Sequence, residues 1–203
     1  MSKQTEQEEL ANNAAVEEET EEETSRGSKA LDWGITIGVP LVLALLIHIF
    51  VLEAFIVPTG SMLETIQLDD RVWSEKVSYR FRSPERGEIA LFQNPTDKDV
   101  TLLKRVIATE GQTVDLVDGK VVVDGVVLDE PYTNGKPSYP LDRQAAGVGT
   151  ISYPLVVPEG HIWLMGDNRT NSLDSRYYGP IPTSTVIARA FCTYWPLDHA
   201  RFL

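Results

Sequence analysis

A run of 19 residues without a formal charge, residues 34–52 (GITIGVPLVLALLIHIFVL), most constrains what this chain can fold into. At 1.5 Å rise per residue, about 20 apolar residues in a helix cross the roughly 30 Å hydrocarbon layer of a bilayer. Pro40 is tolerated in such a helix. The alternative, a buried core helix, fits poorly because the run is long and has no polar face. We expect residues 33–55 to form a single transmembrane anchor.

A cleaved signal peptide is a second alternative for the same run. The preceding region is long and acidic, the run exceeds an ordinary signal-peptide core, and no Ala-x-Ala pattern follows it. Arg26 and Lys29 precede the run, and only Glu53 follows it closely, which favours a cytoplasmic N-terminus. We therefore expect a single-pass protein of the plasma membrane with most of its chain outside the cytoplasm.

The N-terminal segment is strongly acidic. Residues 1–32 carry ten acidic side chains against Lys3, Arg26 and Lys29, in a chain of net charge −12. A segment so acidic and so poor in aromatic residues cannot bury enough surface to offset its ordering entropy. We expect residues 1–28 to be a disordered cytoplasmic tail. Because no strongly basic patch occurs, nucleic acid is not an expected partner.

Downstream of the run, short segments rich in β-branched and aromatic residues alternate with Pro, Gly and Asp clusters, which is typical of strands. Asp-Gly pairs at 118–119 and 124–125 lie between valine-rich runs and predict tight hairpins. The fold class is therefore mainly β, an antiparallel sheet domain after one N-terminal helix. The expected strands are 71–81, 88–93, 102–109, 155–157, 161–165 and 185–195, with long loops at 131–149 and 166–179.

A serine directly after the apolar run is the first candidate for chemistry. Ser61 lies in the stretch Pro-Thr-Gly-Ser-Met, residues 58–62. Because Glu64 follows three residues later, Ser61 also fits a helix capping box, a purely structural role. The two roles are compatible, since a serine at a turn that opens a short helix lies beside free N–H groups able to stabilise an oxyanion.

Lys104 is the best candidate to deprotonate Ser61. In an alternating strand it shares a face with Leu102, Val106 and Ala108, which places its amine against apolar surface. Desolvation lowers the pKa of a lysine, so that its neutral amine can act as a general base. The alternative is an ordinary solvated lysine. The pair predicts a serine/lysine protease.

Residues 166–180 (GDNRTNSLDSRYYGP) gather hydroxyl, amide, carboxylate and guanidinium groups in one loop. An EF-hand is excluded, because Arg169 and Ser172 occupy positions that need a ligand and a glycine. Asn168 begins a possible glycosylation tripeptide. The density of polar groups favours a hydrogen-bonded platform that orients another group.

Histidine offers no competing site. The three histidines show no metal-ligand spacing, and a Ser/His/Asp triad would need His161 or His199, neither of which has a supporting motif.

At these residues the sequence resembles the bacterial type I signal peptidases, membrane-anchored serine proteases that remove signal peptides. The resemblance covers most of residues 33–203. It rests on five stretches in family order: PTGSM, DRVWSEKVSYRF, RGEIALFQNP, LLKRVIATEGQTV and GDNRTNSLDSRYYGPI. It implies that Ser61 is the nucleophile and Lys104 the general base. The Ser61 N–H and the Thr59 hydroxyl would form the oxyanion hole, and Ser172 would orient the lysine. Structural support would come from Asp167, Arg105, Asp174 and Arg176.

The resemblance also implies an extracytoplasmic catalytic domain over residues 56–203, with an inserted β lobe at about 114–153. Phe55, Ile56 and Val57 would dip into membrane lipid. The substrates would be preproteins with signal peptides, cut after an Ala-x-Ala site, and the protein export translocon is an expected partner. No metal and no organic cofactor follow from the resemblance.

Two other functions compete with this one. A self-cleaving regulator of the repressor type also uses a serine/lysine pair, but it is soluble, which the apolar run disfavours. A membrane-tethered β module that only binds exported peptides is disfavoured by the intact Ser61, Lys104 and Ser172.

Overall fold

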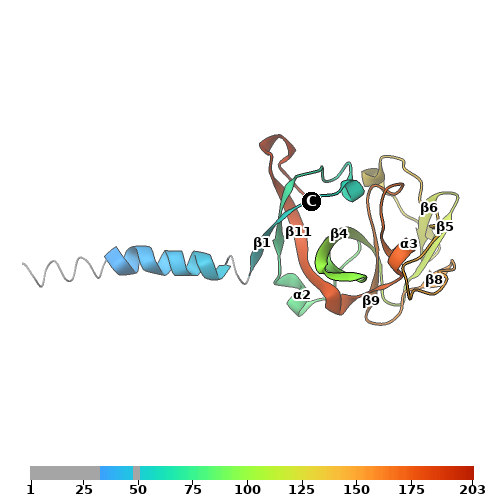
Figure 1. Ribbon diagram of the computed structural model, residues 1–203, viewed down its shortest axis with the longest axis horizontal. Coiled ribbons are helices and arrows are strands. Elements are labelled where there is room, and N and C mark those ends of the chain that lie inside the picture. The colour runs from blue at the N-terminus through green and yellow to red at the C-terminus, as the bar shows by residue number, and fades with distance from the viewer. Residues whose placement is uncertain (1–32, 48–50) are drawn as a thin grey trace, which may run out of the picture. The chain divides into compact units, whose positions relative to one another are not determined.

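The computed structural model describes residues 33–47 and 51–203, and the chain divides into two compact units, Met1–Ile49 and Phe50–Leu203 (Figure 1). In the first unit, residues 33–47 are helical, and most of their side chains are exposed. Among the residues that the structure describes, no helix is both long and apolar enough to cross a membrane. The predicted tail at 1–28 and part of the predicted anchor, 48–50, lie outside the described residues.

The end of the predicted anchor is wrong. Residues 52–55 do not continue a helix; they belong to strand β1 (Leu52–Ile56), which pairs antiparallel with β2 (Arg71–Glu75). Phe55 lies opposite Val72 and packs against the core. An apolar run does not show where a helix ends and a strand begins, because both bury apolar side chains.

The larger sheet of the second unit has the strand order β1-β2-β11-β3-β4-β9-β10, with β12 beside β11. Every pair in it is antiparallel, which confirms the mainly β, antiparallel part of the predicted fold class. Its remaining strands are β3 (Ile89–Asn94), β4 (Asp97–Thr109), β9 (His161–Met165), β10 (Ile181–Pro182), β11 (Val186–Trp195) and β12 (Arg201–Phe202).

The strand predicted over residues 71–81 ends early. After β2 the chain forms the short helix α2 (Ser78–Phe81). The Glu75 carboxylate accepts the backbone N–H groups of Val77 and Ser78, both at 2.9 Å. The Glu75 side chain thereby satisfies N–H groups that the first turn of a helix leaves unpaired. It ends the strand at a place where the residue types alone favour a longer strand.

A second, smaller sheet has the order β7-β6-β5-β8, and Figure 1 shows β5, β6 and β8 together on one side of the unit. Both predicted hairpin turns are present, with positive φ angles at Asp118 (49°) and Asp124 (53°) and at the glycines that follow them. The strands are β5 (Thr113–Val117), β6 (Lys120–Val123), β7 (Val126–Val127) and β8 (Leu155–Val156).

The predicted loop at residues 131–149 contains the 3-10 helix η2 (Pro131–Thr133) and no strand. The loop lies between β7 and β8, so it belongs to the same insertion as the small sheet. That sheet closes with β8, slightly beyond the predicted end of the insertion at residue 153.

The last predicted strand, residues 185–195, is confirmed as β11, and the chain continues beyond it. After β11 come the 3-10 helix η4 (Leu197–His199) and β12, which turns back to place Phe202 opposite Cys192. The side chain of Leu203 then packs against a core cluster. The C-terminal residues are therefore part of the packed unit.

Three apolar clusters form the core. The first includes Met62 and Leu91, the second Phe92 and Val106, and the third Trp163. The first two lie on the larger sheet, and the third joins that sheet to the small one. Burial of these side chains holds β3 and β4 in the register on which the site depends.

Leu91→Ala tests the first cluster. Leu91 is 1% exposed, so the variant should lower the free energy of unfolding by about 2–5 kcal/mol, from lost apolar burial and the cavity left behind. Leu197→Ala is the matched control; its side chain is 74% exposed, and its effect should stay within about 0.5 kcal/mol. Denaturant unfolding of the detergent-solubilised chain measures both, and equal losses would contradict the assigned core.

Candidate active site

Ser61 lies inside the 3-10 helix η1 (Gly60–Met62), and Asn168 fixes the backbone around it. The Asn168 N–H donates to the Ser61 carbonyl at 3.0 Å, and its side-chain amide donates to the Gly60 carbonyl at 2.8 Å. The capping-box interpretation of Ser61 is wrong, because Thr59 occupies the N-cap position and makes no side-chain capping bond. The serine hydroxyl is left for another partner.

That partner is Lys104 on β4. Its Nζ lies 2.7 Å from Ser61 Oγ and donates to the Leu103 carbonyl at 2.9 Å. The lysine is only 3% exposed. Burial lowers the pKa of Lys104 to about 8, although the negative charges of Asp174 and Asp167 oppose the shift. The amine can therefore lose its proton close to neutral pH and accept one from the serine.

The apolar face predicted around Lys104 is partly confirmed. Leu102 and Val106 do belong to one core cluster, with Ala90, the residue opposite Lys104, in the same cluster. Ala108 does not share that face: a β-bulge interrupts the pairing with β9 between Val106 and Ala108, and Ala108 packs in the third cluster. A bulge shifts the alternation of side chains by one residue, which spacing alone does not reveal.

Thr59 lies beside the serine, as the predicted oxyanion hole requires. Its Oγ1 is 3.4 Å from Ser61 Oγ, and the residue is exposed. A hydroxyl at this place can turn toward an oxygen bound above Ser61. The geometry is compatible with the predicted role without testing it.

Ser172 lies next to the same site. An added Cβ at Gly166 would fall 2.3 Å from Ser172 Oγ and 2.5 Å from the Ser61 carbonyl oxygen, so the glycine separates the two serines. Ser172 Oγ is buried and has no hydrogen-bond partner in the described part of the chain. Its predicted bond to Lys104 is not made there, and its role as the lysine-orienting residue stays a prediction. A buried hydroxyl without a hydrogen-bond partner is energetically costly.

Asp167 joins the chain segment after Ser61 to strand β4, which carries Lys104. Its fully buried carboxylate accepts two bonds from the Arg105 guanidinium, at 2.9 and 2.6 Å, and one from the Thr65 hydroxyl at 2.5 Å. Arg105 also donates to the Gly87 carbonyl at 2.8 Å. Because Arg105 neighbours Lys104, this pair fixes the strand position that carries the amine.

Asp174 and Arg176 form a second buried pair in the loop at 166–179. Asp174 caps the short helix α3 (Ser175–Tyr178), which the sequence did not predict, and accepts two bonds from the Arg176 guanidinium, both at 2.9 Å. Its second oxygen also accepts the Gly166 N–H at 3.0 Å. The loop is thus the hydrogen-bonded platform that its composition predicted.

Sequence reasoning missed the role of Arg169. Its side chain is 1% exposed and binds Glu130 of the insertion at 2.5 and 2.8 Å, Ser138 at 2.6 Å and the Gly166 carbonyl at 3.0 Å. The acidic partner lies 39 residues away in a segment without a motif, so no sequence signal pointed to it. Arg169 connects the insertion to the backbone beside the two serines.

Histidine does not complete the site. His199 Nδ1 lies 2.7 Å from Asp70 Oδ1, as in the acid-base half of a triad, but the group in contact with Ser61 Oγ is Lys104. Within residues 33–47 and 51–203, no cluster of His, Cys, Asp or Glu side chains could hold a metal ion.

Several known proteins are similar to this chain in sequence. The family model described as "Signal peptidase, peptidase S26" matches residues 30–195. A probable signal peptidase I-2 of Synechocystis sp. is 36% identical over 96% of this chain and 86% of its own. A signal peptidase I of Leptolyngbya laminosa is 38% identical over 81% of this chain and 79% of its own. A solved signal peptidase I from Enterococcus faecalis is 31% identical over 52% of this chain and 94% of its own, with a TM-score of 0.42.

The chain belongs to the signal peptidase family, peptidase S26. It is an enzyme of the signal peptidase I type, as the resemblance implied.

Gly166→Ala tests the packing between the two serines. A Cβ there would meet Ser172 Oγ and the Ser61 carbonyl far inside contact distance, so the nucleophile must move. A displacement of about 1 Å costs on the order of 100-fold in rate, so kcat/KM should fall by at least that factor. Gly149→Ala is the control, because nothing lies within 4 Å of its added Cβ. Peptidase assays on both variants measure the two rates. Full activity of Gly166→Ala would contradict the close packing of Gly166 against Ser172 and Ser61.

Proposed function

We propose that this chain is a membrane-bound serine endopeptidase that cuts signal peptides from exported preproteins after an Ala-x-Ala site, with Ser61 as nucleophile and Lys104 as general base. One observation carries the proposal: the buried Lys104 Nζ lies 2.7 Å from Ser61 Oγ. A nucleophile within hydrogen-bond reach of a base of lowered pKa is what covalent catalysis by serine requires.

In the proposed reaction, Ser61 Oγ attacks the scissile carbonyl carbon while its proton passes to the neutral Lys104 amine. The carbonyl oxygen becomes an oxyanion, which the Ser61 N–H and the Thr59 hydroxyl stabilise. The C–N bond then breaks, the leaving amine takes the proton from Lys104, and an acyl ester remains on Ser61. A water molecule that loses a proton to Lys104 then attacks the ester carbon. The C–Oγ bond breaks, Ser61 Oγ takes the proton back from Lys104, and the cut segment leaves as a carboxylic acid.

Two unpaired strand edges support binding of an extended preprotein. Among the strands of the described residues, β1 pairs with β2 alone, so it ends the larger sheet. Residues 101–104 of β4 pair with β3, whereas pairing of β4 with β9 begins at Arg105. Free backbone groups on these edges can accept a substrate strand beside the nucleophile, with its Ala side chains in shallow pockets.

Membrane attachment is part of the same proposal. The apolar residues from 33 to the start of β1 supply the anchor, residues 1–28 form the cytoplasmic tail, and the catalytic domain that begins with β1 lies outside the cytoplasm of a single-pass plasma-membrane protein. Ile56 is 56% exposed and suits contact with lipid, whereas Val57 is 3% exposed and belongs to the core. The export translocon would deliver the preprotein at the same membrane.

Removal of either proposed catalytic group should abolish cleavage. We expect Ser61→Ala and Lys104→Ala each to lower kcat by about 10⁴-fold or more, because nucleophile and base act as a unit. The assay is cleavage of a preprotein with an Ala-x-Ala site by the detergent-solubilised chain, with circular dichroism as the folding control. A wild type that binds the preprotein without cutting it favours the binding-module function, and an active Lys104→Ala refutes the assigned base.

The pH dependence tests the state of the lysine. Because only the neutral amine accepts the serine proton, kcat/KM should rise about tenfold per pH unit below the lowered pKa of Lys104, about 8, and level off above it. A pH–rate profile on a peptide without titratable groups measures this. A rate that does not change between pH 6 and 9 would contradict the role of Lys104.

A further inference from the structure

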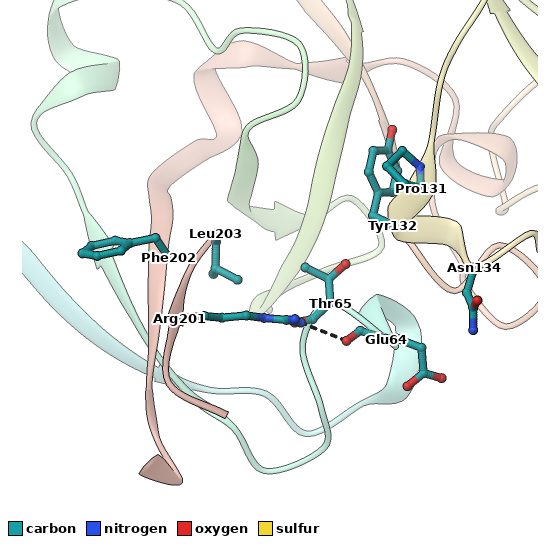
Figure 2. A pocket seen from close by; sticks show the side chains of 8 residues that line it. All are labelled: Glu64, Thr65, Pro131, Tyr132, Asn134, Arg201, Phe202 and Leu203. Atoms are coloured by element: carbon teal, nitrogen blue, oxygen red, sulfur yellow. Dashed lines mark hydrogen bonds between the residues drawn. The ribbon is translucent and has the colours of Figure 1, made fainter. Parts of the chain in front are cut away.

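A pocket of about 570 Å³ is lined by Glu64 and Thr65, which follow Ser61 closely in the chain, and it has no role in the reaction described so far (Figure 2). Its volume is in the range of pockets that hold small ligands or a few peptide residues. Ser61, Lys104 and Ser172 do not line it. Three separate segments form its wall: Glu64 and Thr65; Pro131, Tyr132 and Asn134; and Arg201, Phe202 and Leu203.

The pocket is physically connected to the site. The Thr65 hydroxyl binds Asp167, which in turn binds Arg105 beside Lys104. The ring of Tyr132 lies 4.1 Å from the Arg105 guanidinium. Glu64 is three residues after Ser61, so their Cα atoms are at most about 11 Å apart. An extended peptide over Ser61 covers that distance with roughly three residues.

The charged side chains of the pocket bear on which ligands it favours. The Glu64 side chain is 57% exposed, and the Nζ atom of its ion partner, Lys136, is 4.0 Å from its carboxylate oxygen. The Arg201 guanidinium is engaged by the backbone carbonyls of Glu64 and Thr65, and Figure 2 shows its bond to Glu64. Figure 2 also places the Glu64 carboxylate on the same side of the pocket as the Asn134 amide. Glu64 is the acidic side chain among the residues that line the pocket, and its carboxylate is open to a ligand although Gln67 also donates to it at 3.4 Å.

Resting on the proposed function, we propose that this pocket binds the part of the preprotein that follows the cut bond and favours a basic side chain within its first three residues. The residues before the cut pair with β1 and with residues 101–104 of β4, and none of these lines the pocket. The segment after the cut needs a different surface within about three residues of Ser61, and the Glu64 side of this pocket is within that reach. Glu64 is then a specificity-determining residue.

The test compares peptides that share one Ala-x-Ala site and differ only at the second and third residues after the cut, which are Lys, Gln or Glu. For the wild type, kcat/KM should be about fivefold higher with Lys than with Glu, the size of an exposed charge contact. Glu64→Lys should invert this ratio, and Glu64→Gln should bring it close to one. In 1 M salt the preference of the wild type should shrink, since the screening length falls to about 3 Å.

The ratio within each variant is the readout, so a general loss of activity does not affect it. Asp142→Lys is the matched control: it makes the same charge change at an exposed residue of the insertion that does not line the pocket, and it should keep the ratio of the wild type. An unchanged ratio in both Glu64→Lys and Glu64→Gln overturns the inference while cleavage by the wild type upholds the proposed function. A wild type that cuts none of the peptides overturns both.

Discussion

The buried contact between Lys104 and Ser61 is the interaction on which the rest of the structure depends. A lysine that is 3% exposed loses most of its hydration, and burial lowers its pKa to about 8. The protein limits this shift with the nearby charges of Asp167 and Asp174, each of which is itself paired with an arginine. The surroundings of the amine are thus apolar enough to let it lose its proton near neutral pH. The nearby acidic groups keep its pKa high enough for it to accept a proton.

The pKa of Lys104 and its contact with Ser61 require several chain segments to pack in one exact arrangement. Ser61, the proposed nucleophile, is on η1, and Lys104, the proposed base, is on β4. The loop at 166–179 approaches Ser61 with Gly166, where no side chain has room. Asn168 holds the backbone of η1, while Asp167 holds both Thr65 and Arg105. One loop therefore holds the segments that carry Ser61 and Lys104.

The insertion contributes to the same framework. Glu130 and Ser138 bind the buried Arg169, whose guanidinium also holds the Gly166 carbonyl. Tyr132 packs on Arg105 and at the same time lines the pocket that contains Glu64. The sequence predicts this insertion only as a lobe added to the catalytic domain. In the structure it contacts the backbone of the site and the pocket proposed for the segment that follows the cut bond.

The sequence by itself determined the antiparallel β class, both Asp-Gly hairpins and the pairing of a serine with a lysine, because residue type and local spacing decide turns, strands and motifs. Only the tertiary structure decided that residues 52–55 form β1, that a bulge moves Ala108 off the face of Lys104, and that Arg169 joins Glu130. Strand edges, bulges and buried ion pairs depend on segments far apart in the chain. Their energies arise only when those segments pack together, so no local pattern carries them.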